Sequence, residues 1–502
     1  MKTVCIMGGG LGGLMTGALL TKEGYHVTVL EKNRIIGGGL QSFRRGPYTF
    51  DTGMHVFGGM GSDGQVRRIC RHLGMEDKMA IEPCYDTLMD AGNGQRITLP
   101  FGRKAWTYKW SRSLESMMPN VNISEEIGSY LDKLYDITRQ EPLYWLLPTT
   151  EDYTLPDTSL TAKQLIDDSI SNPLLRTVMS YLSLFYGGRE DSPALLHALI
   201  SCAHIDGTYT FRDGSIGFAN LLADVIKAGG GEVRCGEEVT AIETEGRTVA
   251  AVHTTAGTYT ADHYINDMPI ARLLDMMPSH AFSPAFRRRL GSVPYSMSAM
   301  TLFIGLKPRS LCYNREAYFS GLTTMSPWQA DNCGEADWPN MVFALPAEDK
   351  ENPGFASTIT AICPMSYDYV RQWEDSRTGK RPEEYYHWKE RMMQQALRLI
   401  EPIGFEVPLK EAIAFIDAGT PLTIRDYYGT PYGAMYGIHR SSNNPLQSSL
   451  SPQTRLGNLF LTGQDVNFHG MVGTSLTAIL TAEAIVGRNI IVNKINNTIW
   501  KQ

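Results

Sequence analysis

The opening of the chain switches twice between short apolar runs and glycine. Residues 3–7 are apolar enough to predict a β-strand, and residues 14–22 have the apolar content expected of a helix. Gly24 marks the end of that helix, and residues 27–30 predict a second strand that closes on Glu31. The pattern therefore predicts a strand–turn–helix–strand unit, the start of a Rossmann-like α/β fold.

The turn of this unit has the spacing of a dinucleotide-binding fingerprint. Gly8, Gly10 and Gly13 form G-x-G-x-x-G between the predicted strand and helix. Gly8 permits a tight turn, and Gly10 lets the backbone approach a pyrophosphate because it lacks a Cβ. The helix N-terminus offers free N–H donors to phosphate groups. Leu11 and Gly12 lie inside the turn and join the candidate cofactor-binding residues.

An acidic residue closes the second predicted strand. Glu31 can accept hydrogen bonds from a ribose, and its charge would repel a 2′-phosphate, which favours the adenosine of FAD or NAD over that of NADP. A second glycine cluster, Gly59 to Gly64, has the same spacing. Arg68 replaces the small residue that Gly17 provides in the first unit, so we interpret this second cluster as a flexible loop at a pocket edge.

Further along, apolar periodicity and glycine turns predict more elements, and Ser124 is the expected N-cap of one helix. We expect helices over 124–139, 218–227, 383–400 and 470–486, and strands over 78–81, 238–243, 248–254, 258–265 and 458–462.

Composition narrows the function classes. The 502 residues are 43% hydrophobic and 20% charged with a net charge of −7, as in ordinary soluble proteins. No basic run suggests nucleic-acid binding, and no spacing of His, Cys or acidic residues predicts a metal site. Eight scattered cysteines, the lack of a signal-peptide pattern and the lack of a long apolar stretch favour a cytoplasmic protein. Attachment to a membrane surface stays open, since it needs only an apolar patch.

The segment after Glu31 resembles a known flavoprotein fold. Three glycines, 37–39, precede Leu40 and a Phe-Asp-Thr-Gly stretch at 50–53. The chain resembles the glutathione-reductase-type FAD fold, in which a glycine doublet follows the ribose-binding acid. Family members often carry arginine after the doublet, where this chain has Gly39. The resemblance therefore implies that Gly38, Gly39 and Leu40 bind FAD, with phosphate contacts from the backbone or from Lys32.

The same resemblance assigns residues in the second half of the chain. It implies that Val239 lies beside the adenine through backbone contacts, and that Asp465, close after Gly463, hydrogen-bonds the ribityl chain. It also implies that the C-terminal helix points its N-terminus, at Met471 and Val472, toward the flavin pyrimidine ring. A helix dipole there would stabilise the negative charge of reduced flavin.

Three stretches resemble one branch of these flavoproteins. Residues 50–55, 420–437 and 461–473 are similar to phytoene desaturases, carotenoid isomerases and retinol saturases. The resemblance implies hydride exchange between FAD and a carbon–carbon double bond of a hydrophobic polyene, isoprenoid or lipid. Saturation, desaturation and isomerisation all remain open. Quinone, dioxygen, a nicotinamide or a carrier protein could exchange electrons with the flavin.

The amino-acid composition divides the chain into two interleaved parts. We expect a discontinuous FAD-binding domain over 1–75, 205–285 and 440–502. The segments 76–204 and 286–439 are richer in Trp, Tyr, Met and Pro, and we interpret them as an α+β substrate domain.

Candidate chemistry outside the cofactor motif is sparse. His55 could donate a proton or form a pocket wall, and it is the candidate catalytic residue. The aromatic-apolar runs 142–148 and 181–186 suit a substrate tunnel, a membrane-facing lip or plain core packing. Two alternatives stay open: an amine-oxidase-like flavoprotein, and a prenyl-lipid carrier similar to Rab GDP-dissociation inhibitors, which have this fold without flavin. The complete glycine unit and Asp465 argue against the carrier.

Overall fold

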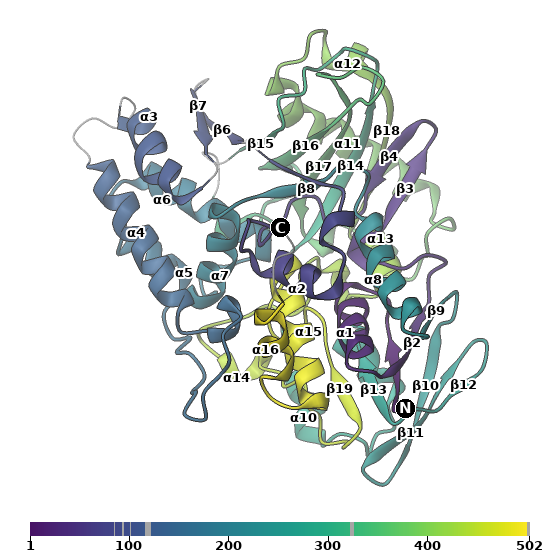
Figure 1. Cartoon of the computed structure of the whole chain (residues 1–502). Coiled ribbons are helices and arrows are strands. Elements are labelled where there is room, and N and C mark those ends of the chain that lie inside the picture. The colour runs from purple at the N-terminus through teal and green to yellow at the C-terminus, as the bar shows by residue number, and fades with distance from the viewer. Residues whose placement is uncertain (85, 93–94, 101, 116–121, 322–325, 499–502) are drawn as a thin grey trace.

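A parallel sheet lies at the base of the molecule (Figure 1). The computed structural model describes residues 1–84, 86–92, 95–100, 102–115, 122–321 and 326–498. In this part of the chain, five strands pair in the order β19-β13-β1-β2-β9. Their bounds are β1 (Thr3–Met7), β2 (His26–Glu31), β9 (Glu232–Cys235), β13 (His263–Asn266) and β19 (Leu459–Leu461). Three distant stretches of sequence therefore form one sheet.

The alternation of side chains along β1 explains how the sheet is covered. Val4 and Ile6 pack in one core with the helices, whereas Cys5 and Met7 pack in a second core on the opposite face. A strand buried on both faces is apolar throughout, as the sequence pattern has it. The helices on the first face are α1 (Leu11–Lys22), α2 (Gln65–Leu73), α8 (Ile216–Ala228), α15 (Gly470–Val486) and α16 (Ile490–Asn496).

Small residues bring α1 close to its neighbours. A Cβ on Gly17 would lie 2.9 Å from Cδ1 of Ile226 in α8 and 3.3 Å from Cγ1 of Val27 in β2. The predicted unit of strand, glycine turn, helix and strand is confirmed, with the helix beginning at Leu11, three residues earlier than the sequence indicated.

The opposite face carries a small antiparallel sheet of β10 (Val239–Glu245), β11 (Thr248–Thr254) and β12 (Thr258–Tyr259), with α9 (Ile270–Met276) and α10 (Pro284–Gly291) beside it. The single strand expected over 258–265 is wrong, because β12 and β13 belong to different sheets. Asp262 lies between them and its carboxylate accepts hydrogen bonds from the N–H and hydroxyl of Thr3, 2.7 and 2.9 Å away. This anchor starts β13 beside β1.

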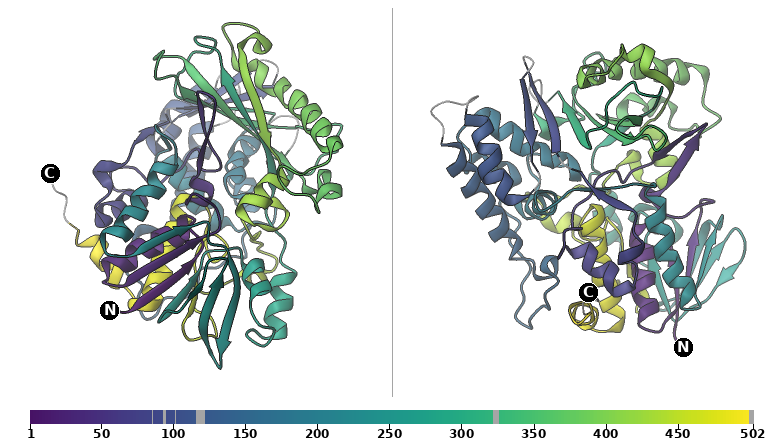
Figure 2. Two further views of the ribbon diagram at one scale, coloured as in Figure 1. Left: turned by 90° about the vertical axis from the view of Figure 1, so that its right-hand side faces the viewer. Right: turned by 45° about the horizontal axis from the view of Figure 1, so that its top comes forward.

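A mixed sheet in the order β18-β14-β17-β16-β15-β6-β7 forms the upper part of the molecule (Figure 2). Its strands are β6 (Asp86–Gly92), β7 (Gln95–Leu99), β14 (Ser298–Leu306), β15 (Glu316–Ser320), β16 (Val342–Glu348), β17 (Ala356–Met365) and β18 (Ile413–Gly419). Near it are α11 (Glu383–Ile400), α12 (Leu409–Ala412) and α13 (Pro421–Tyr428), and α11 shares its apolar core. Helix α11 has the predicted bounds.

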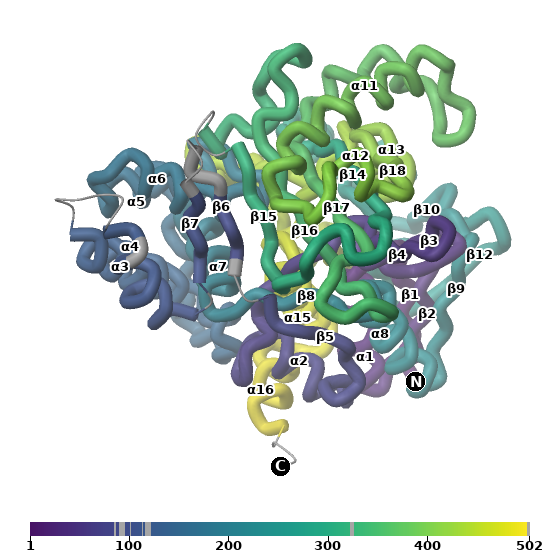
Figure 3. Tube along the Cα trace, turned by 90° about the horizontal axis from the view of Figure 1, so that it is seen from above, coloured from purple at the N-terminus to yellow at the C-terminus, as the bar shows by residue number. Residues whose placement is uncertain are grey.

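A group of helices lies to one side of both sheets (Figure 3). They are α3 (Ser111–Glu115), α4 (Ile123–Thr138), α5 (Ala162–Asp167), α6 (Pro173–Ser180) and α7 (Ala194–Ile205). The N-cap prediction at Ser124 is wrong: the side-chain oxygen of Asn122 accepts from the Glu125 N–H, 3.4 Å away. Asn122 immediately precedes the first residue of α4, which is the N-cap position, and its side chain satisfies one of the free N–H groups of the first turn.

Short elements complete the chain. The hairpin β3 (Ser42–Arg45) and β4 (Tyr48–Asp51) forms a sheet of its own and packs against β14. Strand β5 (Ile81–Pro83) pairs with β8 (Tyr209–Phe211), and α14 (Pro445–Ser448) precedes β19. The strand expected over 78–81 is displaced to β5, because a short 3-10 helix occupies Glu76–Lys78. None of the helices formed by the described residues has the length and apolar character needed to cross a bilayer.

Candidate active site

A cavity of about 310 Å³ opens at the carboxyl ends of the parallel strands, where ligands bind in open α/β sheets. We call it the glycine-lined cavity. Its walls include most of the candidate cofactor residues: Gly8, Gly10, Leu11, Gly12, Glu31, Lys32, Gly38, Gly39, Leu40, Val239, Gly463 and Asp465. Residues from three distant segments of the chain thus meet in one place.

The glycines of the first turn have no room for side chains. A Cβ on Gly12 would lie 2.7 Å from the Cα of Gly463, and a Cβ on Gly13 would collide with the carbonyl oxygen of Gly8. The Gly37 N–H donates to the Gly9 carbonyl at 2.7 Å, so the second glycine run lies against the first. The result is a bare backbone surface at the start of α1, which suits a phosphate group.

The carboxylate of Glu31 is fixed at the end of β2. Its Oε2 accepts from the Gly9 N–H at 2.9 Å, and its Oε1 accepts from the Asn33 N–H at 2.8 Å. Each oxygen keeps further acceptor capacity for a ligand hydroxyl. Lys32 also lines the cavity, but its Nζ donates to the Asp426 carbonyl at 3.1 Å, and burial lowers its pKa.

Asp267 follows β13 directly and lies between the two glycine turns. A Cβ built on Gly10 would be 2.7 Å from its Oδ2, and one built on Gly463 would be 2.5 Å from its Oδ1. Burial raises the pKa of Asp267 to about 7, the N–H groups of Gly13 and Gly10 lower it, and the charge of Glu31 raises it. The sequence prediction missed this residue.

Asp465 also lines the glycine-lined cavity. Its Oδ2 accepts from the Ile270 N–H at 2.9 Å and its Oδ1 from the Ile438 N–H at 3.2 Å. Burial raises its pKa, whereas these N–H groups and the charge of Arg440 lower it. Arg440 also donates to the Asp465 carbonyl oxygen at 2.7 Å, which holds the loop after β19.

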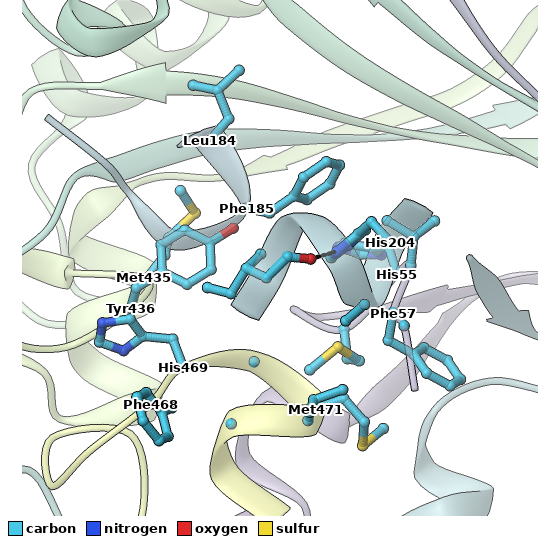
Figure 4. A pocket seen from close by; sticks show the side chains of 18 of the residues that line it. His55, Phe57, Leu184, Phe185, His204, Met435, Tyr436, Phe468, His469 and Met471 are labelled. Carbon is cyan, nitrogen blue, oxygen red and sulfur yellow. Dashed lines mark hydrogen bonds between the residues drawn. The ribbon is translucent and has the colours of Figure 1, made fainter. Parts of the chain in front are cut away.

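A second cavity, of about 130 Å³, adjoins the first, and we call it the apolar cavity. Its walls come mainly from η5 (the 3-10 helix Tyr181–Tyr186), α7, the upper sheet and the start of α15. They include Leu184, Phe185, Leu196, Leu199, Ile200, Ala203, Met297, Phe319, Phe343, Phe468, Met471, Val472 and Leu476. Figure 4 shows His55 and His204 on one side of this space, with Tyr436, Phe468 and His469 on the other.

The two cavities share a wall, which we call the junction. It consists of Gly53, Met54, His55, Ile362, Met435, Tyr436 and Gly470. Burial lowers the pKa of His55, and the nearby charge of Asp51 raises it. Helix α15 begins at the junction with Gly470, and the candidates Met471 and Val472 line the apolar cavity.

Two further sequence interpretations, on the second glycine cluster and on the aromatic runs, can be compared with the cavities. The glycine cluster 59–64 leads into α2, and none of its residues lines either of these two cavities. Of the aromatic runs, Tyr144, Leu184 and Phe185 line the apolar cavity, whereas Leu147 is exposed to solvent. These runs therefore serve mostly as packing and partly as cavity wall.

The residues that the sequence prediction missed lie mainly at the junction and on the upper sheet, where Met435, Tyr436, Ile362 and Phe319 contribute to the walls. Asp267 had one available signal, an acidic residue placed directly after a buried strand that neighbours β1. Such positions meet at the ligand-binding edge of a parallel sheet.

A family comparison decides the type of protein. The profile described as flavin containing amine oxidoreductase matches residues 11–332, more than half of the chain. The chain belongs to this family. A flavin cofactor and oxidoreductase chemistry follow from that membership, and the bare glycine turn, the fixed Glu31 carboxylate and the adjoining cavity fit a flavin nucleotide.

Curated relatives of this family member include carotenoid and retinoid enzymes. All-trans-retinol 13,14-reductase of Danio rerio is 25% identical over 525 residues, covering 97% of this chain and 86% of its own. The human protein of the same name is 26% identical with the same coverage. A 4,4'-diaponeurosporene oxygenase of Staphylococcus aureus is 26% identical over 54% of this chain and 56% of its own.

Solved structures agree on the fold. An oxidoreductase from Methanosarcina mazei superposes with a TM-score of 0.63 at 15% identity, covering 95% of this chain and 99% of its own. A putrescine oxidase variant gives 0.63 at 12% identity, covering 97% and 98%. A fatty acid isomerase from P. acnes gives 0.59 at 14%, also covering 97% and 98%. The predicted Rossmann-like flavoprotein fold is therefore confirmed.

Proposed function

We propose that this flavin-dependent oxidoreductase binds FAD and exchanges hydride with a carbon–carbon double bond of a hydrophobic polyene or isoprenoid. The observation that carries the proposal is the junction, where a polar, glycine-lined cavity opens directly onto an apolar one. A dinucleotide whose adenosine end lies by Glu31 would direct its other end toward Gly470. The substrate would then approach from the apolar side.

FAD is favoured over FMN by the lining of the first cavity. Val239 and Glu31, the bare turn of α1, and Asp465 and Gly470 all contribute to its walls. Only a dinucleotide would use the acceptor at Glu31 and the phosphate-suited turn together. We assign adenine contact to Val239 and ribityl contact to Asp465, as well as phosphate contacts to Gly10, Gly12 and Gly38.

The substrate class follows from the second cavity. Its walls are almost entirely aliphatic and aromatic, which favours a long apolar molecule and excludes water from the reacting carbons. The retinol reductases and the diaponeurosporene oxygenase are named for polyenes, which agrees with this lining. Bound FAD would supply the hydride chemistry.

The chain's own contribution at the junction is positional. The N-terminus of α15 offers N–H groups and a positive partial charge near Met471 and Val472, which would stabilise negative charge on a reduced flavin ring. His55 faces both cavities, and burial keeps its ring neutral near pH 7, so it can hold or pass a proton beside the substrate. Quinone, dioxygen, a nicotinamide or a carrier protein remains the candidate electron partner.

One experiment tests both halves of this proposal. The cofactor is released from the purified protein and identified by chromatography before and after phosphodiesterase, which cleaves FAD and leaves FMN intact. The oxidised holoprotein is then mixed without oxygen with a polyene or with an amine, and bleaching of the flavin is followed. In a parallel sample the holoprotein is photoreduced without oxygen and mixed with retinol or a carotenoid, and reoxidation of the flavin is followed; the products are analysed in both cases. We expect FAD and a product changed at a carbon–carbon double bond. Oxidation of an amine with no reaction of any polyene would contradict the substrate class and support an amine oxidase.

The same data distinguish the carrier alternative. A prenyl-lipid carrier would bind isoprenoids without any flavin signal. A colourless, folded protein that takes up no added FAD would therefore overturn the enzyme proposal.

A further inference from the structure

The carboxyl group of Asp267 lies in the part of the glycine-lined cavity that suits a phosphate. Its Oδ2 is 2.7 Å from the position of a Cβ on Gly10, and its Oδ1 is 2.5 Å from that of a Cβ on Gly463. Gly10 immediately precedes α1, and Gly463 belongs to the turn after β19. The carboxyl group therefore lies between the two backbone turns that face the middle of a dinucleotide.

The groups around Asp267 are acidic or uncharged. Glu31 approaches from β2 and Asp465 from the loop after β19, and both disfavour a second negative charge, whereas the N–H groups of Gly10 and Gly13 favour it. The cations of the cavity are engaged elsewhere. Lys32 donates to the Asp426 carbonyl at 3.1 Å, and Arg272 lies 3.9 Å from the Glu238 carboxylate. Arg440 is engaged with Asp465: it donates to the Asp465 carbonyl oxygen at 2.7 Å, and its charge lowers the pKa of the Asp465 carboxyl group.

An ionised Asp267 and a pyrophosphate would compete for the same N–H groups at the start of α1. Two anions held in one desolvated place repel each other strongly, and the weaker acid is the one that takes up a proton. A protonated carboxyl group changes from competitor to partner, because its O–H can donate to a phosphate oxygen.

We propose that Asp267 is a cofactor-binding residue that holds the FAD pyrophosphate as a neutral acid, so that FAD binding takes up one proton from solvent. The inference rests on the proposed identity of the cofactor as FAD. No covalent bond changes: the proton moves from solvent to one Asp267 oxygen, which then donates to the pyrophosphate.

The direction of the pH dependence follows from the protonation equilibrium. Before FAD binds, the pKa of Asp267 is about 7, because burial and neighbouring acids raise it. The pyrophosphate charge raises that pKa further in the complex. FAD affinity is therefore highest below about pH 7 and falls about tenfold for each pH unit above it, until the pKa of the complex is reached.

The test measures FAD binding, not turnover. Flavin is removed from the full-length protein, and FAD is titrated back between about pH 6 and about pH 9, on either side of the pKa of about 7, with flavin fluorescence as the signal. We expect the dissociation constant of the wild type to rise by about tenfold per pH unit in the upper range. Asp267→Asn keeps a hydrogen-bond donor and cannot ionise, so its dissociation constant should not change with pH. Calorimetry at about pH 8 in two buffers with different ionisation enthalpies should show one proton taken up per FAD by the wild type and none by the variant.

The controls separate this inference from the proposed function. Asp224→Asn alters an exposed carboxylate of α8 and should keep the wild-type slope. Asp267→Ser gives a second neutral variant in case the amide disturbs folding. A wild-type dissociation constant that is flat with pH, or a slope retained by both neutral variants, would overturn the role of Asp267 while leaving FAD as the cofactor. Failure of the wild type to bind FAD at every pH would contradict the proposed function and this inference with it.

Discussion

The two cavities differ in what holds their shape. The glycine-lined cavity is formed by backbone and by a few fixed acids, such as Glu31 with its two N–H donors. The apolar cavity is formed by side chains such as Leu184, Phe319 and Leu476, which come from separate elements and are held by packing alone. A backbone site has little tolerance for added atoms, whereas a side-chain site tolerates changes of size better than changes of polarity.

The largest effect should come from one added methyl group in the backbone site. In Gly12→Ala the new Cβ would lie 2.7 Å from the Gly463 Cα and closer still to Oδ1 of Asp267, so the turns that face the cofactor would have to shift. Overpacking of this kind costs up to about 3 kcal/mol, so FAD affinity should fall about 100-fold. Flavin content of the purified variant and its dissociation constant measure the loss.

Gly217→Ala is the matched control, because Gly217 lies in α8 with no neighbouring atom within 4 Å of its Cβ position. It should keep full flavin content. If the two variants retain flavin equally, close backbone approach is not what defines the cavity.

A loss of similar size, in turnover and not in FAD affinity, is expected at the junction. His55→Phe keeps a ring of similar size and removes the only part of His55 that can carry a proton. If the ring moves a proton during the reaction, turnover should fall roughly 100-fold with flavin content unchanged. Burial lowers the pKa of His55 below its ordinary value, so the wild-type rate should vary with this group only on the acid side of about pH 6.5. The variant should lack that variation. An unchanged turnover would show that His55 only forms part of the cavity wall.

A charge placed in the wall of the apolar cavity should weaken substrate binding and leave FAD binding intact. Leu184→Asp introduces a carboxylate into a half-buried apolar wall, at a cost of roughly 2 kcal/mol. The KM for a polyene should rise about tenfold or more, while FAD affinity stays the same. Leu147→Asp, at a site with 52% exposure, controls for added charge and should leave both unchanged. A parallel loss of flavin in Leu184→Asp would mean that the two cavities are not independent.

The same contrast explains what could be predicted from the sequence. The first glycine unit and the strand over 248–254 depend on local signals, such as glycine spacing and apolar alternation, and both were predicted correctly. Candidate residues such as Gly8, Glu31 and Gly463 do line one cavity, because their motif fixes their place at the ends of neighbouring strands.

The apolar cavity could not be predicted in this way. Phe319, Ile362 and Met435 are apolar residues in apolar surroundings, and nothing local distinguishes a cavity wall from a packed core. Asp267 was missed for a related reason. Its strand, His263–Asn266, was joined in the prediction to residues of another sheet, so its position beside β1 was not apparent. Strand order, which depends on long-range packing, is needed to find it.

The smallest expected effect links Glu31 to Asp267. Glu31→Gln keeps an acceptor but loses charge, and charged hydrogen bonds exceed neutral ones by about 1 kcal/mol, so FAD affinity should fall about fivefold at low pH. The negative charge of Glu31 also raises the pKa of Asp267. Its removal should therefore move the onset of the pH-dependent loss of FAD affinity to lower pH, because Asp267 then ionises more easily. Fluorescence titration over the same pH range measures both changes, and an onset that stays in place or moves upward would show that the two carboxyl groups do not interact.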